Sequence, residues 1–164
     1  MAVTTDILQS YRDPGGVMRR MLAQGPREDR AAAVLMLAAA LIFVAGLAPA
    51  RRAALLDPTV PLEALVAGRL MAAVFVMPLV AYAVAWASHL VARLMGGRGS
   101  AHGARLALFW ALLAVSPLML VQGLIAGLAG PGPALTLSGA VVFGAFLWIW
   151  FGGLRAAAFG GQPA

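Results

Sequence analysis

The chain has 164 residues, of which 62% are hydrophobic and only 11% are charged. A soluble domain normally carries about 45–50% apolar and about 25% charged residues, because it must cover its surface with polar side chains. The composition therefore excludes an ordinary soluble domain, and it equally excludes a disordered chain, which needs low hydrophobicity. The mean hydropathy of +0.90 indicates that the solvent of this chain is a lipid bilayer.

Cysteine and lysine are both absent, which removes several kinds of chemistry. Without cysteine there is no disulfide, thiolate metal site or thiol nucleophile, and without lysine there is no Schiff base. The formal net charge is +6, and all twelve basic residues are arginines. In so apolar a chain we attribute this charge to membrane topology and to attraction for anionic lipid, and we predict no nucleic-acid partner.

Residues 1–30 precede the first apolar stretch and are expected to form a cytoplasmic head of two short amphipathic helices. In the second helix three apolar residues share one face and two arginines lie beside it, a pattern typical of a helix in the headgroup layer. One interpretation is an anchor and topology signal, and the other is a docking segment for a partner protein. The candidates for contact with lipid or a partner are Arg12, Met18, Arg19, Arg20, Met21 and Leu22.

Four later stretches have the roughly 20 mostly apolar residues that a membrane-spanning helix needs. They cover residues 31–48, 70–92, 106–128 and 134–151. The sequence AGPGP at 129–133 predicts a tight turn between the last two. The connection at 51–68 is expected to be an exposed turn followed by the start of a helix. We therefore predict an all-α membrane bundle over residues 31–155 and a short cytoplasmic tail at 156–164.

Arginine counts predict the orientation of the bundle, because arginine is retained on the cytoplasmic side of a membrane. With four spans, nine of the twelve arginines lie on the side that carries both termini. The chain is therefore expected to sit in the bacterial inner membrane with its amino and carboxyl termini in the cytoplasm.

The predicted spans contain no aspartate or glutamate and only two notable polar side chains, His89 and Gln122. His89 is interpreted either as an interfacial histidine or as a proton or ligand site, and Gln122 needs a hydrogen-bond partner on a neighbouring helix. Outside the spans, His102 is expected to be solvated. Pro78 and Pro117 are expected to bend their helices, because proline removes a backbone hydrogen bond.

Small residues give the clearest packing signal in the spans. Helices in lipid associate largely through close backbone approach and dispersion, which small side chains permit. The sequence GLIAG at 123–127 is a GxxxG motif, which either packs one helix against another within the chain or binds a second copy or another membrane subunit. The helix-packing candidates are Gly123, Gly127, Gly130 and Gly144.

The first thirty residues carry a distinctive order of features: a short apolar helix, YRDP at 11–14, a helix with Arg19 and Arg20, and REDR at 27–30 before a span. This pattern resembles bacterial members of the Yip1 domain family. The resemblance implies an integral membrane protein that acts through protein or lipid contacts rather than catalysis. Family members usually have about five spans, which leaves a fifth membrane segment open. The Asp-Leu-Tyr and Gly-Tyr motifs of eukaryotic relatives are missing, so a role tied to small GTPases is not carried over.

The sequence contains no recognisable catalytic, cofactor-binding or metal-binding motif, so we predict no catalytic residues, no cofactor and no metal. The first functional hypothesis is a non-catalytic membrane protein for organisation or scaffolding, whose partners are lipids, further copies or other membrane subunits. The alternatives are an accessory subunit of a larger bacterial membrane complex and a small transporter or channel.

Overall fold

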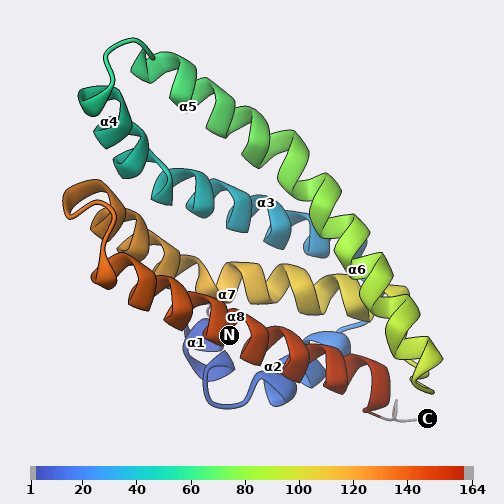
Figure 1. Ribbon diagram of the computed structural model, residues 1–164. Coiled ribbons are helices and arrows are strands. Elements are labelled where there is room, and N and C mark those ends of the chain that lie inside the picture. Colours follow the sequence, from blue (N-terminus) through green and yellow to red (C-terminus); the bar gives the residue numbers. More distant parts are fainter. Residues whose placement is uncertain (1–2, 161–164) are drawn as a thin grey trace.

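The computed structural model describes residues 3–160, and within them all regular secondary structure is helical (Figure 1). The prediction of an all-α protein with a helical amino-terminal segment is confirmed. The helices are α1 (Val3–Ser10), α2 (Pro14–Leu22), α3 (Glu28–Ala45), α4 (Leu47–Leu56), α5 (Leu62–Met71), the π-helical turn η1 (Ala72–Val76), α6 (Met77–Leu94), α7 (Ala101–Leu128) and α8 (Pro133–Phe159).

In the described part of the chain, four helical runs are long and apolar enough to cross a membrane, as predicted. They are longer than expected, because the helices continue beyond the stretches of highest hydropathy. Arg51 and Arg52 were expected in an exposed turn, but they lie in α4, and the connection to α5 is confined to residues 57–61. Similarly, α8 continues into the expected tail as far as Phe159, and residues 161–164 lie outside the described residues.

The helix α7 forms the centre of the bundle and contacts α3, α4, α6 and α8. Half of the most apolar stretch of α7 is buried within the protein, compared with 11–22% in the other three spans. Its side chains Phe109 and Leu113 are almost fully enclosed, and the edge of the Phe109 ring meets Tyr82 of α6 at 5.0 Å between centroids. The outer helices therefore present most of their apolar side chains to the surrounding lipid.

A break between α3 and α4 brings their backbone against α7. Pro49 has no N–H to donate to the carbonyl of Ala45, so the regular hydrogen-bond pattern ends at Gly46. The freed Ala45 carbonyl lies directly over Gly123, where any β-carbon would overlap it. One turn later, Gly127 meets Ala48 in the same way. At these two glycines the GxxxG motif therefore packs within the chain.

The carboxyl-terminal end of α7 is capped by an arginine from α4. The guanidinium of Arg52 donates to the carbonyl oxygen of Leu128 at 3.1 Å. It also lies where a β-carbon of Gly130 would be, and Gly130 has a φ of +78° that favours glycine. Gly130, expected to pack helices, therefore ends α7 and makes room for a cation at the negative end of the helix dipole.

Replacing Arg52 with glutamine is expected to lower the free energy of unfolding by about 1 kcal/mol, because the last carbonyls of α7 lose a charged donor. This corresponds to a fall of about 3 °C in the melting temperature for a chain of this size. Intrinsic tryptophan fluorescence in detergent micelles measures the change. The neighbouring variant Arg51→Gln is the matched control, because Arg51 is exposed and makes no comparable contact among the described residues. Equal melting temperatures for the two variants would contradict the capping role.

Both predicted proline sites are accommodated without ending their spans. Before Pro78 the helix widens into η1, where the N–H of Met77 donates to the carbonyl of Ala72, five residues back. At Pro117 the helix α7 continues, and the hydroxyl of Ser116 donates to the carbonyl of Leu113 at 2.8 Å, which is the carbonyl that Pro117 cannot serve. Side chains and local widening thus satisfy the backbone inside the membrane.

Candidate functional site

The amino-terminal head, of which α1 and α2 are described, lies against α7 and α8 near the carboxyl-terminal half of α8 (Figure 1). The indole Nε1–H of Trp110 donates to the Oγ of Ser10 at 2.8 Å, and both side chains are buried. The Ser10 hydroxyl in turn donates to the carbonyl of Asp6 at 2.7 Å. The Ser10 hydroxyl is buried and both donates and accepts a hydrogen bond. It therefore fastens α1 to the central helix of the bundle.

A second hydrogen bond fastens the head to α7 close to Pro117. The hydroxyl of Tyr11 donates to the carbonyl of Ala114 at 2.7 Å, three residues before Pro117. Burial raises the pKa of the Tyr11 hydroxyl above its ordinary value, because the charged phenolate loses its solvation. The phenol therefore stays protonated and remains a donor throughout the physiological pH range.

The apolar face of α2 packs on the bundle and is not presented to lipid. The carboxylate of Asp13 accepts from the N–H of Gly16 at 2.7 Å and begins the helix, with Pro14 in its first turn. Met18 and Met21 were expected to contact lipid or a partner, but they are 1% and 5% exposed within the chain. The reason is a smooth strip on α8, where glycines at 152 and 153 let α2 approach closely. Leu22 is half-buried beside them.

The three arginines expected to contact lipid or a partner divide into two kinds. Arg20 is held within the head, because its guanidinium pairs with Asp6 at 3.3 Å and donates to Gln9 at 2.8 Å. Arg12 and Arg19 instead line a cavity of about 470 Å³ between the head and α8. Arg155 of α8 lines the same cavity, which we call the arginine cavity. Within residues 3–160, none of its three arginines forms an ion pair.

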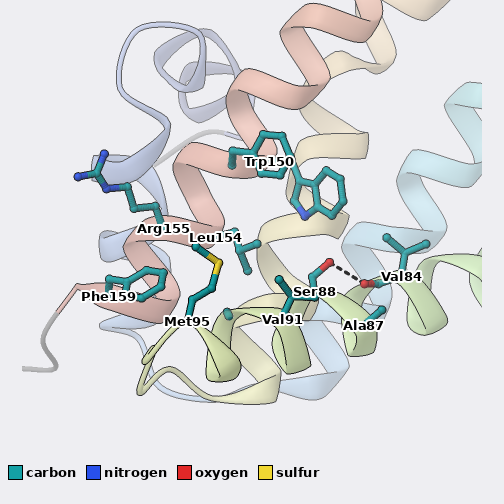
Figure 2. Close-up of a pocket in the computed structure, with 11 residues that line it drawn as sticks. Val84, Ala87, Ser88, Val91, Met95, Trp150, Leu154, Arg155 and Phe159 are labelled. Atoms are coloured by element: carbon teal, nitrogen blue, oxygen red, sulfur yellow. Dashed lines mark hydrogen bonds between the residues drawn. The ribbon is translucent and has the colours of Figure 1, made fainter.

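An apolar groove of about 910 Å³ runs between α6 and α8, and we call it the α6–α8 groove (Figure 2). Figure 2 shows Ser88, Val91 and Met95 on the α6 side and Trp150 and Leu154 on the α8 side. The indole Nε1 of Trp150 is buried and has no hydrogen-bond partner in the described structure. In contrast, the hydroxyl of Ser88 is satisfied by the carbonyl of Val84 at 2.6 Å. Arg155 and Phe159 line both this groove and the arginine cavity, so the two spaces adjoin.

A charged cluster joins the amino-terminal ends of α3 and α7. The Nδ1 of His102 lies 3.1 Å from a carboxylate oxygen of Glu28, and the guanidinium of Arg105 pairs with the same oxygen. His102 is 7% exposed, so the expectation of a solvated histidine is wrong. The correction has a physical cause: residues 101–104 form the first turn of α7, begun by Ser100, rather than a loop.

The remaining predicted residues do not come together into one site. His89 is half-buried near the end of α6 and lines a cavity of only about 10 Å³ with Arg93 and Ser100. The amide of Gln122 lies over Gly139 of α8, on a different part of the bundle. Gly144 was expected to pack helices, but no atom lies within 4 Å of its would-be β-carbon. Gly144 faces outward, because other residues form the buried side of α8.

Two features of this region were missed in the sequence. Nothing local in the sequence shows that Trp150 and Arg155 line adjoining spaces. The signal that could have found Arg155 is the spacing of 148, 152, 155 and 159, which places aromatic, small and basic residues on one side of α8. Among the described residues, no three His, Cys, Asp or Glu side chains gather closely enough to hold a metal ion.

Four apolar helical runs, three of them packed around the central helix α7, and an amphipathic head docked on them define a multi-pass helical membrane protein. The family model of the Yip1 domain matches residues 8–161, so the chain belongs to the Yip1 domain family. The match begins within α1, so most of the described head is part of the matched domain. No curated protein and no solved structure matches the chain.

Proposed function

We propose that this Yip1 domain protein organises the membrane through contacts with other membrane proteins and lipids, and that it has no catalytic activity of its own. The observation that carries the proposal is the outward surface of the second span, from α5 to α6. No residue of α5 is buried, and Met71, Phe75 and Leu79 are 58%, 62% and 72% exposed. A span that gives so little surface to its own bundle has most of it available for partners.

The buried polar side chains support a structural rather than a chemical role. In the described part of the chain they are Ser10, His102 and Ser116, and each has a hydrogen-bond partner within the protein. A catalytic site needs titratable or nucleophilic groups that face a space for substrate. These three groups are instead used to join α1, α3 and α7 or to repair the backbone.

We further propose the topology predicted from the arginines, with both termini in the cytoplasm and the chain in the bacterial inner membrane. The structure brings the carboxyl-terminal ends of α6 and α8 and the amino-terminal ends of α3 and α7 to one end of the bundle. This end carries nine of the twelve arginines, which supports its assignment to the cytoplasmic side.

Photo-crosslinking in native membranes tests the proposed contacts. A photoreactive residue at Phe75 or Leu79 is expected to give a discrete crosslink to a protein, and the same residue at the exposed Val141 of α8 is the matched control. A crosslink to a further copy supports a homo-oligomer, and one to another membrane subunit supports the accessory-subunit alternative. Crosslinks to lipid alone at Phe75 and Leu79 would contradict protein contacts through this surface.

A small transporter is the second candidate, and the π-helical turn before Pro78 favours it, because such turns are frequent at functional sites. A flux assay in liposomes separates the candidates. Specific transport that is lost in His89→Gln and kept in the control Gln122→Leu would replace the proposal above.

A further inference from the structure

We propose that the seam between the head and α8 binds one anionic phospholipid, with its phosphate in the arginine cavity and an acyl chain in the α6–α8 groove. This inference rests on the proposed contact-based role and names one of its partners. The lipid would come from the leaflet that faces the head, which is the cytoplasmic leaflet in the orientation proposed above.

The arginine cavity has the charge and the donors that a phosphate needs. Arg12, Arg19 and Arg155 line it, and the carboxylate of Asp13 is the one acidic group in its lining. That carboxylate is occupied by the N–H of Gly16 at the start of α2. Three guanidinium groups against one engaged carboxylate leave a net positive site, and arginine binds phosphate with paired, charge-assisted hydrogen bonds.

Close packing of α2 on α8 creates this juxtaposition of arginines. Gly15 faces the carbonyl of Gly152, and the guanidinium of Arg19 lies against Gly15. The helix α2 is thereby held beside α8 with Arg19 on the same side as Arg155. Figure 2 shows Arg155 extending away from Met95 and from the interior of the α6–α8 groove. The charge is therefore placed at the edge of the apolar space and not within it.

The α6–α8 groove has the dimensions and lining of a site for an acyl chain. Its α6 wall runs from Val84 to Met95, which is about 16 Å along a helix and roughly half of the 30 Å hydrocarbon layer. Valine, leucine, methionine and aromatic side chains make up most of its surface, and Arg155 and Phe159 line it near the carboxyl-terminal end of α8. The groove thus spans one leaflet, with the positive charge at its headgroup end.

The unpaired indole of Trp150 supports a glycerolipid over a simple hydrocarbon. A buried donor without a partner costs free energy unless a ligand supplies an acceptor. Trp150 precedes Arg155 by five residues, so it lies about 7 Å deeper in the membrane along α8. The ester carbonyls of a phospholipid lie on the hydrocarbon side of the phosphate, and they are acceptors at that level.

Native mass spectrometry of the full chain tests the site. The protein is purified in mixed micelles with equal phosphatidylglycerol and phosphatidylcholine, and the retained lipid is identified. We expect one phosphatidylglycerol per chain in clear excess over phosphatidylcholine. Arg155→Gln and Arg19→Gln should each weaken retention about fivefold, because a basic residue near a lipid phosphate contributes about that factor. The matched control Arg98→Gln removes an exposed arginine at the same end of the bundle and should leave retention unchanged.

A second pair of variants tests the groove separately from the charge. Val91→Trp fills the α6–α8 groove and should lower phosphatidylglycerol retention, whereas the adjacent Leu90→Trp, outside the groove lining, should not. Equal retention of the two lipids, or equal retention by Val91→Trp and Leu90→Trp, would overturn the proposal. If millimolar inorganic phosphate released the lipid and Val91→Trp had no effect on retention, the site would bind an anion alone. This result would also overturn the proposal. Phe75 crosslinks that persist in Arg155→Gln would show that the protein contacts stand independently of the lipid site.

Discussion

Gly123→Ala is expected to lower the free energy of unfolding by about 3 kcal/mol or more, although it adds only one methyl group. The β-carbon would overlap the carbonyl oxygen of Ala45, and this atom belongs to the backbone, so it cannot move aside like a side chain. The end of α3 would have to move away from α7. Thermal unfolding in detergent, followed by tryptophan fluorescence, should show a melting temperature lower by about 9 °C or more.

Gly144→Ala is the matched control, because it makes the same chemical change in α8 with no atom nearby. Alanine favours a helix over glycine by about 1 kcal/mol, so this variant should be as stable as the parent or slightly more stable. If both substitutions had the same effect, the close approach of α3 to α7 at Gly123 would not be what stabilises the bundle.

The double variant Ser10→Ala, Tyr11→Phe is expected to free the head from the bundle. It leaves the Trp110 Nε1–H without a partner and removes the Tyr11 donor from the Ala114 carbonyl, at a cost of about 2–4 kcal/mol for the two changes. Local opening of α1 and α2 should then become more frequent than opening of the spans. Hydrogen–deuterium exchange in detergent micelles should show the amides of α1 and α2 exchanging at least about tenfold faster.

Leu8→Ala provides the comparison for this experiment. Leu8 lies on α1 but is 72% exposed, so its truncation should leave the exchange of the head unchanged. Faster exchange spread evenly over α1 to α8 in the double variant would mean that the two hydrogen bonds stabilise the whole bundle rather than the docking of the head.

The bundle could be predicted from the sequence because its main signal is local. A run of apolar residues long enough to cross the bilayer forms a helix whatever its neighbours are, since unpaired backbone groups are so costly in lipid. The GxxxG motif at 123–127 was likewise visible, because close packing needs small residues wherever the partner lies. The sequence could not distinguish Gly123 from Gly144, since both are glycines in apolar helices. They differ because the end of α3 lies against Gly123, whereas no atom lies close to Gly144 of α8.

The candidate site could not be predicted, because it depends on contacts between distant parts of the chain. Ser10 and Trp110 are one hundred residues apart, and no feature of the sequence near either residue indicates that they form a hydrogen bond. The amphipathic pattern of α2 was read correctly as one apolar face, but periodicity does not say whether lipid or protein covers that face. Protein covers it here, because the glycines at 152 and 153 have no side chains and let α2 pack closely on α8 with Met18 buried between them.

The second span, Leu62–Leu94, has 33 residues, and its first helix, α5, has no buried residue. At 1.5 Å per residue the span is about 50 Å long, well beyond the roughly 30 Å hydrocarbon layer. A helix with such a mismatch tilts or bends, and here α5 can bend at η1 while α6 keeps its packing against α7. The inclination of α5 should therefore follow the thickness of the surrounding bilayer.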